Sequence, residues 1–324
     1  MTQDNPQRRV MQAEVPEAMG GRRLDQVLAE LFPEFSRSRL QLWVKSGQVT
    51  VDGAVLRPRD KLIGGEQIAV DAELAVEIPY AAEPIPLEIL YEDAAILVLN
   101  KPAGLVVHPA AGNWQGTMLN ALLHHAPQLE HVPRAGIVHR LDKETSGLLV
   151  VAKTLEAQTA LVEQLQARSF TREYDAVVNG VLTGGGSVNE PMARHPTDRK
   201  RMAVQRGGKE AITHYRLVRR FRAHSQIRVK LETGRTHQIR VHMAYLHYPL
   251  IGDPVYGGRL RVPPASSEGF IQALRLFHRQ ALHAARLGLE HPETGEYMEW
   301  TQPMPADMQA LLSALEQDLA EHGG

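Results

Sequence analysis

The chain has 324 residues, of which 43% are hydrophobic and 23% are charged, and its formal net charge is −1; this length allows two domains and a well-buried core. The absence of cysteine excludes disulfides, thiolate catalysis and cysteine-ligated metal sites. No apolar run approaches the roughly 20 residues of a membrane span, and residues 1–10 lack the apolar stretch of a secretory signal, so we expect a cytoplasmic protein that does not enter a membrane.

The small net charge hides a strong asymmetry along the chain. Residues 66–93 contain eight acidic residues and no Lys or Arg, whereas residues 194–240 contain fourteen Lys and Arg against three acidic residues. Local charge decides what docks on a surface, so the second region indicates a nucleic-acid partner. The alternative is that its arginines are simply solvated on the outer faces of strands.

The first 72 residues divide into a flexible N-terminus, residues 1–19, and a small αβ unit, residues 20–72. Apolar residues at helical spacing predict a helix that ends at Pro33. A serine cap predicts a second helix, and Asp52-Gly53 predicts a hairpin turn. The expected elements are helices over 24–31 and 36–46, hairpin strands over 48–51 and 54–56, and a last strand over 67–70.

The outer face of this unit is predicted to be basic. On the second helix, Arg37, Arg39 and Lys45 lie opposite the inward residues Leu40 and Val44. Such a surface suits a phosphate backbone. The order of the elements resembles the S-four-like RNA-binding domain, named after a ribosomal protein, which implies that these three basic side chains bind RNA. The alternative is a small structural domain with surface arginines.

Residues 73–86 are expected to be an extended linker, because the segment is acidic and carries Pro79, Pro84 and Pro86. This composition predicts a mobile N-terminal domain. In residues 87–324, strands cluster instead of alternating strictly with helices, which predicts an α+β fold with a mostly antiparallel mixed sheet. The predicted strands are 95–100, 147–152, 174–182, 211–221 and 226–232, and the predicted helices are 117–125, 155–168 and 236–246.

A polar cluster around Asp142 is the first candidate for chemistry. It follows the apolar pair Ile137-Val138 and precedes a buried strand, so Asp142 lies on a turn between core elements, where catalytic groups are commonly placed. Arg140 and Lys143 flank it and favour the ionised carboxylate that a nucleophile needs. From the residues alone, an Asx-turn or a helix cap is the commoner role of such an aspartate.

Four motifs favour a catalytic role for Asp142 over a turn or cap, because they occur together and in order. They are Asn100-Lys101-Pro102-Ala103-Gly104 with His108-Pro109, His139-Arg140-Leu141-Asp142 with Thr145-Ser146-Gly147, Arg172-Glu173-Tyr174, and Thr233-Gly234-Arg235-Thr236-His237-Gln238-Ile239-Arg240-Val241-His242. In this combination the chain resembles the RluA-type RNA pseudouridine synthases over nearly its whole length. Segments 107–113, 132–136 and 253–259 resemble the members of that family that act on large-subunit ribosomal RNA.

The resemblance implies a pseudouridine synthase domain that isomerises uridines in RNA without a cofactor, since the reaction involves no redox change. It implies that Asp142 is the catalytic nucleophile, that Tyr174 stacks on the flipped uracil, and that Arg240 pairs with Asp142 and favours its ionised form. Ile239 would pack beside the base, and Arg140 would support the flipped nucleotide. A core aromatic remains the alternative for Tyr174, and a structural role remains the alternative for Arg140.

The histidines and Arg235 complete the predicted cleft. Arg235 and His237 in the last motif are expected to contact the substrate. A metal site is not expected, because the chain has no HExxH pattern and no cysteine, and because His237 and His242, five residues apart, do not share a helical face. We expect these two histidines and His139 to form hydrogen bonds within the cleft.

A second candidate for RNA contact is the run of residues 194–201, which is rich in charge and contains a proline. We predict a loop without regular structure, in which Arg194, Arg199, Lys200 and Arg201 grip RNA phosphates near the cleft. The alternative is a solvated hairpin tip.

The resemblance implies a synthase that modifies several uridines in a stem-loop of 23S-type ribosomal RNA at the subunit interface, and we expect it to be a monomer. Free RNA and an assembling subunit both remain open as the substrate, as do nucleophilic attack and elimination as the route. The main alternative is a noncatalytic rRNA-binding ribosome-assembly factor, which would need none of Asp142, Tyr174 and Arg240. A hydrolase or nuclease, and a synthase for tRNA or another rRNA site, are further alternatives.

Overall fold

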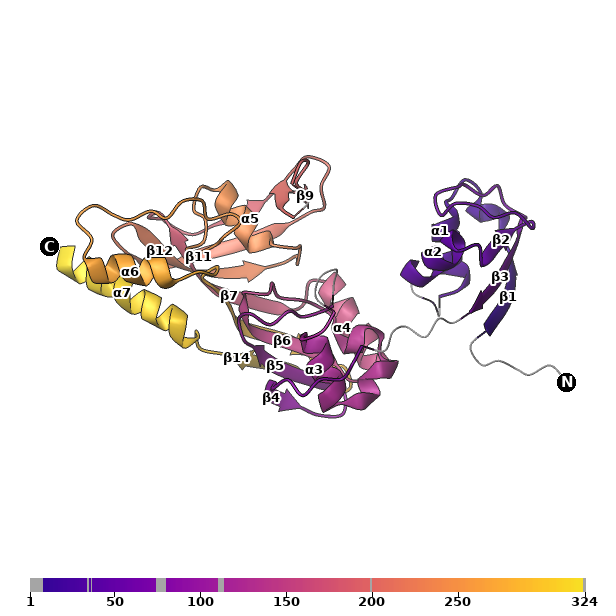
Figure 1. The fold of residues 1–324 in the computed structure, drawn as a ribbon, viewed down its shortest axis with the longest axis horizontal. Coiled ribbons are helices and arrows are strands. Elements are labelled where there is room, and N and C mark those ends of the chain that lie inside the picture. Colours follow the sequence, from indigo (N-terminus) through magenta and orange to yellow (C-terminus); the bar gives the residue numbers. More distant parts are fainter. Residues whose placement is uncertain are drawn as a thin grey trace. The chain divides into compact units, whose positions relative to one another are not determined.

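The computed structural model describes residues 8–33, 35, 37–73, 80–109, 114–198 and 200–322 (Figure 1). Its contacts divide the chain into two compact units, Met1–Pro79 and Tyr80–Gly324. The boundary between the units falls within residues 73–86, the acidic segment expected to be the linker. None of the helices in the described residues has the length and apolar character of a membrane span.

The N-terminal unit packs two helices on a three-stranded antiparallel sheet. The strand order is β1-β3-β2. Buried apolar side chains from both helices and from the sheet form its core, including Leu24, Leu28, Trp43 and Ile68. The elements are β1 Arg8–Glu14, η1 Glu17–Met19, α1 Leu24–Leu31, α2 Arg37–Lys45, β2 Val49–Val51 and β3 Gln67–Glu73.

Two features of this unit differ from the prediction. Residues 8–14, expected to be part of a flexible N-terminus, form β1 along β3, because Met11 and Ala13 alternate with polar residues and pack on the core. The turn at Asp52-Gly53 is present with positive φ at both residues, but the chain after it makes only the single bridge Val51–Ala54. The main partner of β2 is β3.

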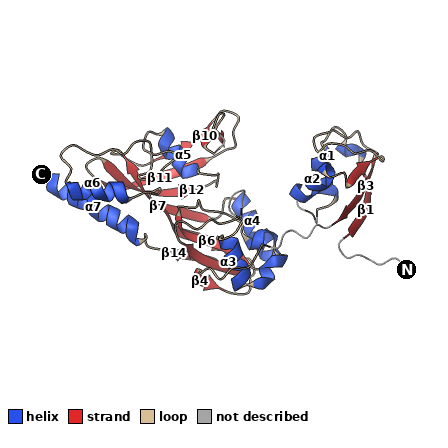
Figure 2. Ribbon diagram, in the orientation of Figure 1, coloured by secondary structure: helices blue, strands red, loops and turns tan. Residues whose placement is uncertain are grey.

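The C-terminal unit is built on a nine-stranded mixed sheet with the order β4-β5-β6-β13-β7-β12-β11-β8, to which β14 adds beside β13. Only the β6–β13 pair is parallel among the strand pairs of the described residues, so the expected α+β fold with a mostly antiparallel sheet is confirmed (Figure 2). The strands are β4 Glu88–Glu92, β5 Ile96–Lys101, β6 Ser146–Ala152, β7 Thr171–Asn179, β8 Gly186–Asn189, β11 Ile212–Arg220, β12 His224–Leu231, β13 Leu282–Glu290 and β14 Tyr297–Thr301.

Side-chain alternation along the central strands divides the core into two faces. On β6, Leu149 and Val151 belong to one buried cluster, whereas Leu148 and Val150 belong to another. The first cluster includes side chains of α3 and α5, and the second includes side chains of α4. The helices are α3 Met118–His125, α4 Leu155–Gln166, α5 Gln238–Tyr245, α6 Glu268–Leu276 and α7 Ala306–His322, with the 3-10 turns η2 Pro127–His131 and η3 Pro133–Gly136.

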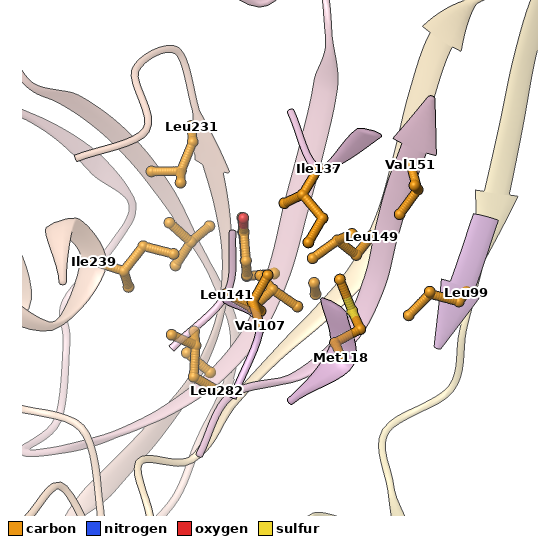
Figure 3. Close-up of a cluster of buried hydrophobic side chains, with 14 of the residues drawn as sticks. Leu99, Val107, Met118, Ile137, Leu141, Leu149, Val151, Leu231, Ile239 and Leu282 are labelled. Carbon is orange, nitrogen blue, oxygen red and sulfur yellow. The ribbon is translucent and has the colours of Figure 1, made fainter. Parts of the chain in front are cut away.

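The first cluster also anchors the residues next to the predicted catalytic groups. Leu141, which precedes Asp142, and Ile239, which precedes Arg240, are both 4% exposed and lie in this cluster (Figure 3). Leu282 on β13 packs in the same cluster. Asp142 and Arg240 are therefore each adjacent in sequence to a fixed core side chain, which limits how far the loop and the helix can move.

Candidate active site

The Asp142 turn is held by backbone contacts on both sides. The N–H of Thr145 donates to the carbonyl oxygen of Asp142 at 3.0 Å, and the N–H of Gly104 donates to that of Lys143 at 2.9 Å. The hydroxyl of Thr145 accepts a hydrogen bond from the Gln280 side chain at 3.0 Å. The turn therefore belongs to the rigid scaffold, as catalytic loops usually do.

Lys101 links the loop of residues 102–105 to this turn through hydrogen bonds made inside the protein. Its ammonium donates to the carbonyl oxygens of Pro102, Leu105 and Lys143 at 2.8–2.9 Å, and the residue is fully buried. Burial lowers its pKa to about 7. All three N–H donors of the charged amine are used by backbone acceptors, so Lys101 has a local structural task and no free hydrogen for a substrate.

An ion-pair chain runs from the turn to helix α5. The Arg240 guanidinium donates to Asp142 Oδ2 at 2.9 Å and makes two bonds, of 2.7 and 2.9 Å, to the carboxylate of Asp253. Burial by itself lowers the pKa of Arg240, but the bonds to Asp253 and then to Asp142 outweigh it, so its pKa is raised. Arg240 is therefore a permanent cation fixed between two carboxylates.

Asp253 is the second carboxylate that Arg240 bonds. Burial opposes its charge, yet its pKa is lowered, because Arg240 and the backbone N–H groups of Tyr256 and Val255 stabilise the carboxylate. It is completely buried, whereas the side chain of Asp142 is 17% exposed. Of the two carboxylates beside Arg240, only Asp142 can therefore meet a substrate.

His237 lies on the other side of Asp142. It is the N-cap residue of α5 and has left-handed backbone angles, with φ of 58°. Its Nδ1 is 2.8 Å from the hydroxyl of Tyr256, and its Nε2 is 3.9 Å from Asp142 Oδ1. The second distance is too long for a hydrogen bond.

A cleft of about 570 Å³ opens in front of these groups, a volume within the usual range for a small-ligand site. Its lining comes from the Asp142 turn, β7, the end of β12, the loop before α5, and α4. The lining includes Arg140, Asp142, Arg172, Tyr174, Arg235, His237, Ile239 and Arg240.

Comparison with known proteins decides the family. Residues 95–245 match the model of the RNA pseudouridylate synthase family, and residues 22–68 match the S4 domain. Ribosomal large subunit pseudouridine synthase D of Pseudomonas aeruginosa is 61% identical over 94% of this chain and 96% of its own length. The chain belongs to the RNA pseudouridylate synthase family. The expected isomerase class and the expected N-terminal domain type are thereby confirmed.

Other relatives of this pseudouridine synthase agree. Synthase D of Escherichia coli strain K12 is 56% identical over 98% of this chain and 97% of its own length. Among solved structures, human RNA Pseudouridylate Synthase Domain Containing 4 is 26% identical, with a TM-score of 0.56 over 71% of this chain and 93% of its own. Human RNA Pseudouridylate Synthase Domain Containing 1 shares the fold, with a TM-score of 0.53 over 69% of this chain and 85% of its own, at 24% identity.

All five predicted substrate residues, His237 among them, line the cleft of this synthase beside the Asp142–Arg240 pair. Tyr174 on β7 is 7% exposed and lies in the core cluster as well as in the cleft wall, so its position fits both the stacking role and the core alternative. Ile239 is buried in the wall, whereas Arg140 is exposed at it. Arg235 donates through Nε to the carbonyl oxygen of Glu210 at 2.9 Å.

The structure adds a cation that the sequence argument did not single out. Arg172 is 7% exposed and lines the cleft on the same face of β7 as Tyr174. It donates to the carbonyl oxygen of Glu232 at 2.9 Å, and its Nε has no hydrogen-bond partner among the described residues. Burial lowers its pKa. Its spacing of two residues from Tyr174 on a strand is the signal that could have found it.

In the basic run 194–201, the described residues after Arg194 have no regular structure, as predicted. Arg194 ends strand β9, Met192–Arg194, which pairs with β10, Met202–Val204, and residues 195–198, 200 and 201 lie between these two strands. The pairing follows from the apolar residues on both sides of the run. Arg194 and Lys200 are exposed, Arg201 lies over the ring of Tyr256 at 5.3 Å, and Arg199 lies outside the described residues.

Of the remaining predicted residues, His139 also lines the cleft. Arg39 is partly exposed and Lys45 exposed on α2 of the first unit, and the side chain of Arg37 lies outside the described part. His139 accepts a hydrogen bond from the N–H of Val150 at 3.1 Å, and His242 bonds Thr213 and the carbonyl oxygen of Glu190. Across the described residues, no group of three or more potential metal ligands comes together.

Proposed function

We propose that this enzyme converts uridines of large-subunit ribosomal RNA to pseudouridine, with Asp142 as the catalytic nucleophile. The observation that carries the proposal is the Asp142 carboxylate, which Arg240 holds through Oδ2 while its side chain stays accessible from the cleft. Relatives that are 56–61% identical are named for the large ribosomal subunit, which supports this choice of RNA.

The reaction exchanges one bond of the ribose C1′ atom for another. The N1–C1′ bond breaks, the uracil turns, and C5 joins C1′; a proton leaves C5 and N1 takes up a proton, so substrate and product are isomers. As N1 leaves, positive charge develops at C1′, as it does in glycoside hydrolysis, and a carboxylate stabilises that centre. Asp142 either attacks the sugar or base directly or assists the loss of a C2′ proton. Each of these routes uses the same carboxylate in the same position.

The uracil must leave the RNA stack before Asp142 can reach it. In this proposal, the ring of Tyr174 stacks on the flipped base and Ile239 forms the apolar wall beside it. Arg140, exposed at the cleft, supports the flipped nucleotide. Arg235 and His237 bind its polar groups.

Basic side chains outside the cleft hold the rest of the RNA through its phosphates. They come from the hairpin β9–β10 and from α2 of the S4 unit. They are Arg194, Arg199, Lys200, Arg201, Arg37, Arg39 and Lys45. We propose that the enzyme works as a monomer in the cytoplasm and modifies several uridines of one stem-loop, either in free rRNA or in an assembling large subunit.

Chemical mapping of pseudouridines tests the proposed substrate. The purified protein is incubated with unmodified large-subunit rRNA, with the same rRNA inside large-subunit particles, and with small-subunit rRNA and tRNA as matched controls. We expect new pseudouridines in large-subunit rRNA alone, clustered in one stem-loop. Modification confined to tRNA or small-subunit rRNA would overturn the proposed substrate.

Two other outcomes of this experiment would favour the rival functions. Tight binding of large-subunit rRNA without any new pseudouridine would support the assembly factor. Release of free uracil, or cleavage of the strand, would support a hydrolase or nuclease.

A further inference from the structure

Tyr256 connects three parts of the catalytic unit that are distant in sequence. Its hydroxyl accepts a hydrogen bond from the N–H of Met202 on β10 at 2.9 Å and lies 2.8 Å from Nδ1 of His237. Its own backbone N–H donates to Asp253, which also holds Arg240. Tyr256 is 9% exposed, so these contacts form inside the protein.

Two guanidinium groups also lie over the Tyr256 ring. The central carbon of Arg240 is 5.0 Å from the ring centroid, and that of Arg201 is 5.3 Å from it. Both distances are within cation–π range. Removal of the hydroxyl alone therefore leaves the ring with two strong contacts that keep it in position.

The hydrogen-bond partners of the hydroxyl favour one position for the ring hydrogen of His237. The N–H of Met202 can only donate, so the tyrosine oxygen accepts there. Among the described residues, the other partner of the hydroxyl is Nδ1 of His237. Donation of the tyrosine proton to Nδ1 is the arrangement that also gives the O–H group an acceptor among these partners, and a neutral imidazole that accepts at Nδ1 carries its own hydrogen at Nε2.

The Nε2–H group of His237 then faces the cleft beside the reacting carboxylate. It lies 3.9 Å from Asp142 Oδ1, beyond hydrogen-bond distance, and the side chains of His237 and Asp142 are 21% and 17% exposed. His237 also keeps a left-handed backbone, which is uncommon for a residue other than glycine and persists mainly where the surroundings require it. Burial lowers the pKa of His237, which favours the neutral ring near pH 7.

We propose that Tyr256 is a positioning residue that holds His237 as the Nε2–H tautomer, and that His237 donates this hydrogen to an oxygen of the flipped nucleotide next to Asp142. The second half rests on the proposed function. His237 is then a hydrogen-bond donor in the ground state and does not take a proton from the substrate. Met202 belongs to the basic hairpin β9–β10, and its N–H bonds the Tyr256 hydroxyl. The hairpin that we propose to bind RNA is therefore linked directly to the Tyr256–His237 pair.

Nitrogen NMR of the histidine side chains tests the tautomer directly, with 15N-histidine-labelled full-length protein. In the wild type we expect Nε2 of His237 in the protonated range of chemical shift and Nδ1 in the unprotonated range. In Tyr256→Phe, which keeps the ring, we expect both signals to move to the averaged values of mixed tautomers. Arg201→Gln is the control, because it removes a ring contact and leaves the hydroxyl, so the tautomer should not change.

Single-turnover conversion of a large-subunit rRNA stem-loop tests the second half. We expect Tyr256→Phe to lower the rate constant about tenfold, the worth of one well-placed hydrogen bond, with the RNA dissociation constant unchanged. In a His237→Gln background, whose amide always carries hydrogens, Tyr256→Phe should cost less than twofold.

Several results would overturn the proposal. An Nδ1–H tautomer in the wild type, or an unchanged tautomer in Tyr256→Phe, contradicts its first half. A loss confined to RNA affinity contradicts its second half. If wild-type protein modifies no large-subunit rRNA, the proposed function and this second half fall together, while the NMR result still decides the tautomer.

Discussion

Two residues just before the candidate nucleophile, His139 and Leu141, are fixed by contacts with the core. Leu141 is 4% exposed in the core, and Nε2 of His139 accepts the N–H of Val150 on β6. Arg240 then fixes one oxygen of Asp142. The carboxylate is thus pre-organised by packing before any RNA arrives, which is the condition for efficient catalysis by a single charged group.

The partly buried His139 should make stability depend on pH. Burial, with a contribution from Arg172, lowers its pKa to about 3, whereas an unfolded histidine titrates near 6.5. As the pH falls below about 6.5, the unfolded chain takes up the proton first. The stability that His139 contributes is therefore complete above that pH and is lost as the pH falls toward 3, by about 1.4 kcal/mol per pH unit.

His139→Gln tests this account, because the amide oxygen can still accept the N–H of Val150 but does not titrate. Urea unfolding from pH 7 to 4 should give the variant a shallower loss of free energy of unfolding than the wild type. The other histidines are the same in both proteins and serve as the internal control. Equal slopes would show that His139 is already solvated in the folded protein.

At the scale of the elements, the parallel pair β6–β13 sets where the Asp142 turn ends. Gly147 is the second residue of β6 and has φ of 114°. A Cβ atom at this position would lie 2.3 Å from the carbonyl oxygen of Ala284 on β13. Only glycine fits a strand that approaches its neighbour so closely.

We therefore expect Gly147→Ala to lower the free energy of unfolding by at least about 3 kcal/mol, from backbone strain and overpacking together. Gly295→Ala is the matched control, because Gly295 has φ of 72° but nothing within 4 Å of the added Cβ atom, so strain alone costs about 1 kcal/mol. Urea denaturation of both variants measures the difference. Equal losses of free energy of unfolding in the two variants would mean that β13 shifts at Ala284 at little cost to make room for the added Cβ atom.

Periodicity predicted the helices and strands whose pattern is local. The helix over 24–31 and the strands β5 and β6 were predicted within one or two residues, because their apolar residues occur at regular spacing. Strand β13 was not predicted, although it lies at the centre of the sheet. Its sequence mixes charged and small residues, and its partners are distant in the chain. Helix α7 was also missed, despite the buried spacing of Met308, Leu311 and Leu315.

In the site, the resemblance to a family predicted one pairing but not the contacts that support it. The expected pair of Asp142 and Arg240 is present, across 98 residues of sequence. Asp253 and Tyr256 also lie in a motif that carried the resemblance, yet nothing in that motif says that they hold Arg240 and His237. Such contacts depend on the folded chain, and side-chain spacing does not reveal them.

At the scale of the whole molecule, RNA binding and the isomerisation step use different groups of side chains in the proposed function. The S4 unit and the hairpin β9–β10 supply basic side chains that bind phosphates. These side chains give affinity for RNA but contribute little to the reaction itself. The cleft of the second unit holds the carboxylate, the aromatic ring and the fixed cation. Affinity for RNA and the isomerisation step should therefore be separable by mutation.

The most direct test of the central claim is the loss of tritium from RNA labelled at uridine C5, since C5 loses its hydrogen when it joins C1′. We predict that wild-type enzyme releases tritium from a large-subunit rRNA stem-loop. Asp142→Asn, which keeps the shape and removes the charge, should release none above background while binding the same RNA with an unchanged dissociation constant. Release by Asp142→Asn within a few-fold of the wild-type rate would contradict the assignment of Asp142 as the nucleophile.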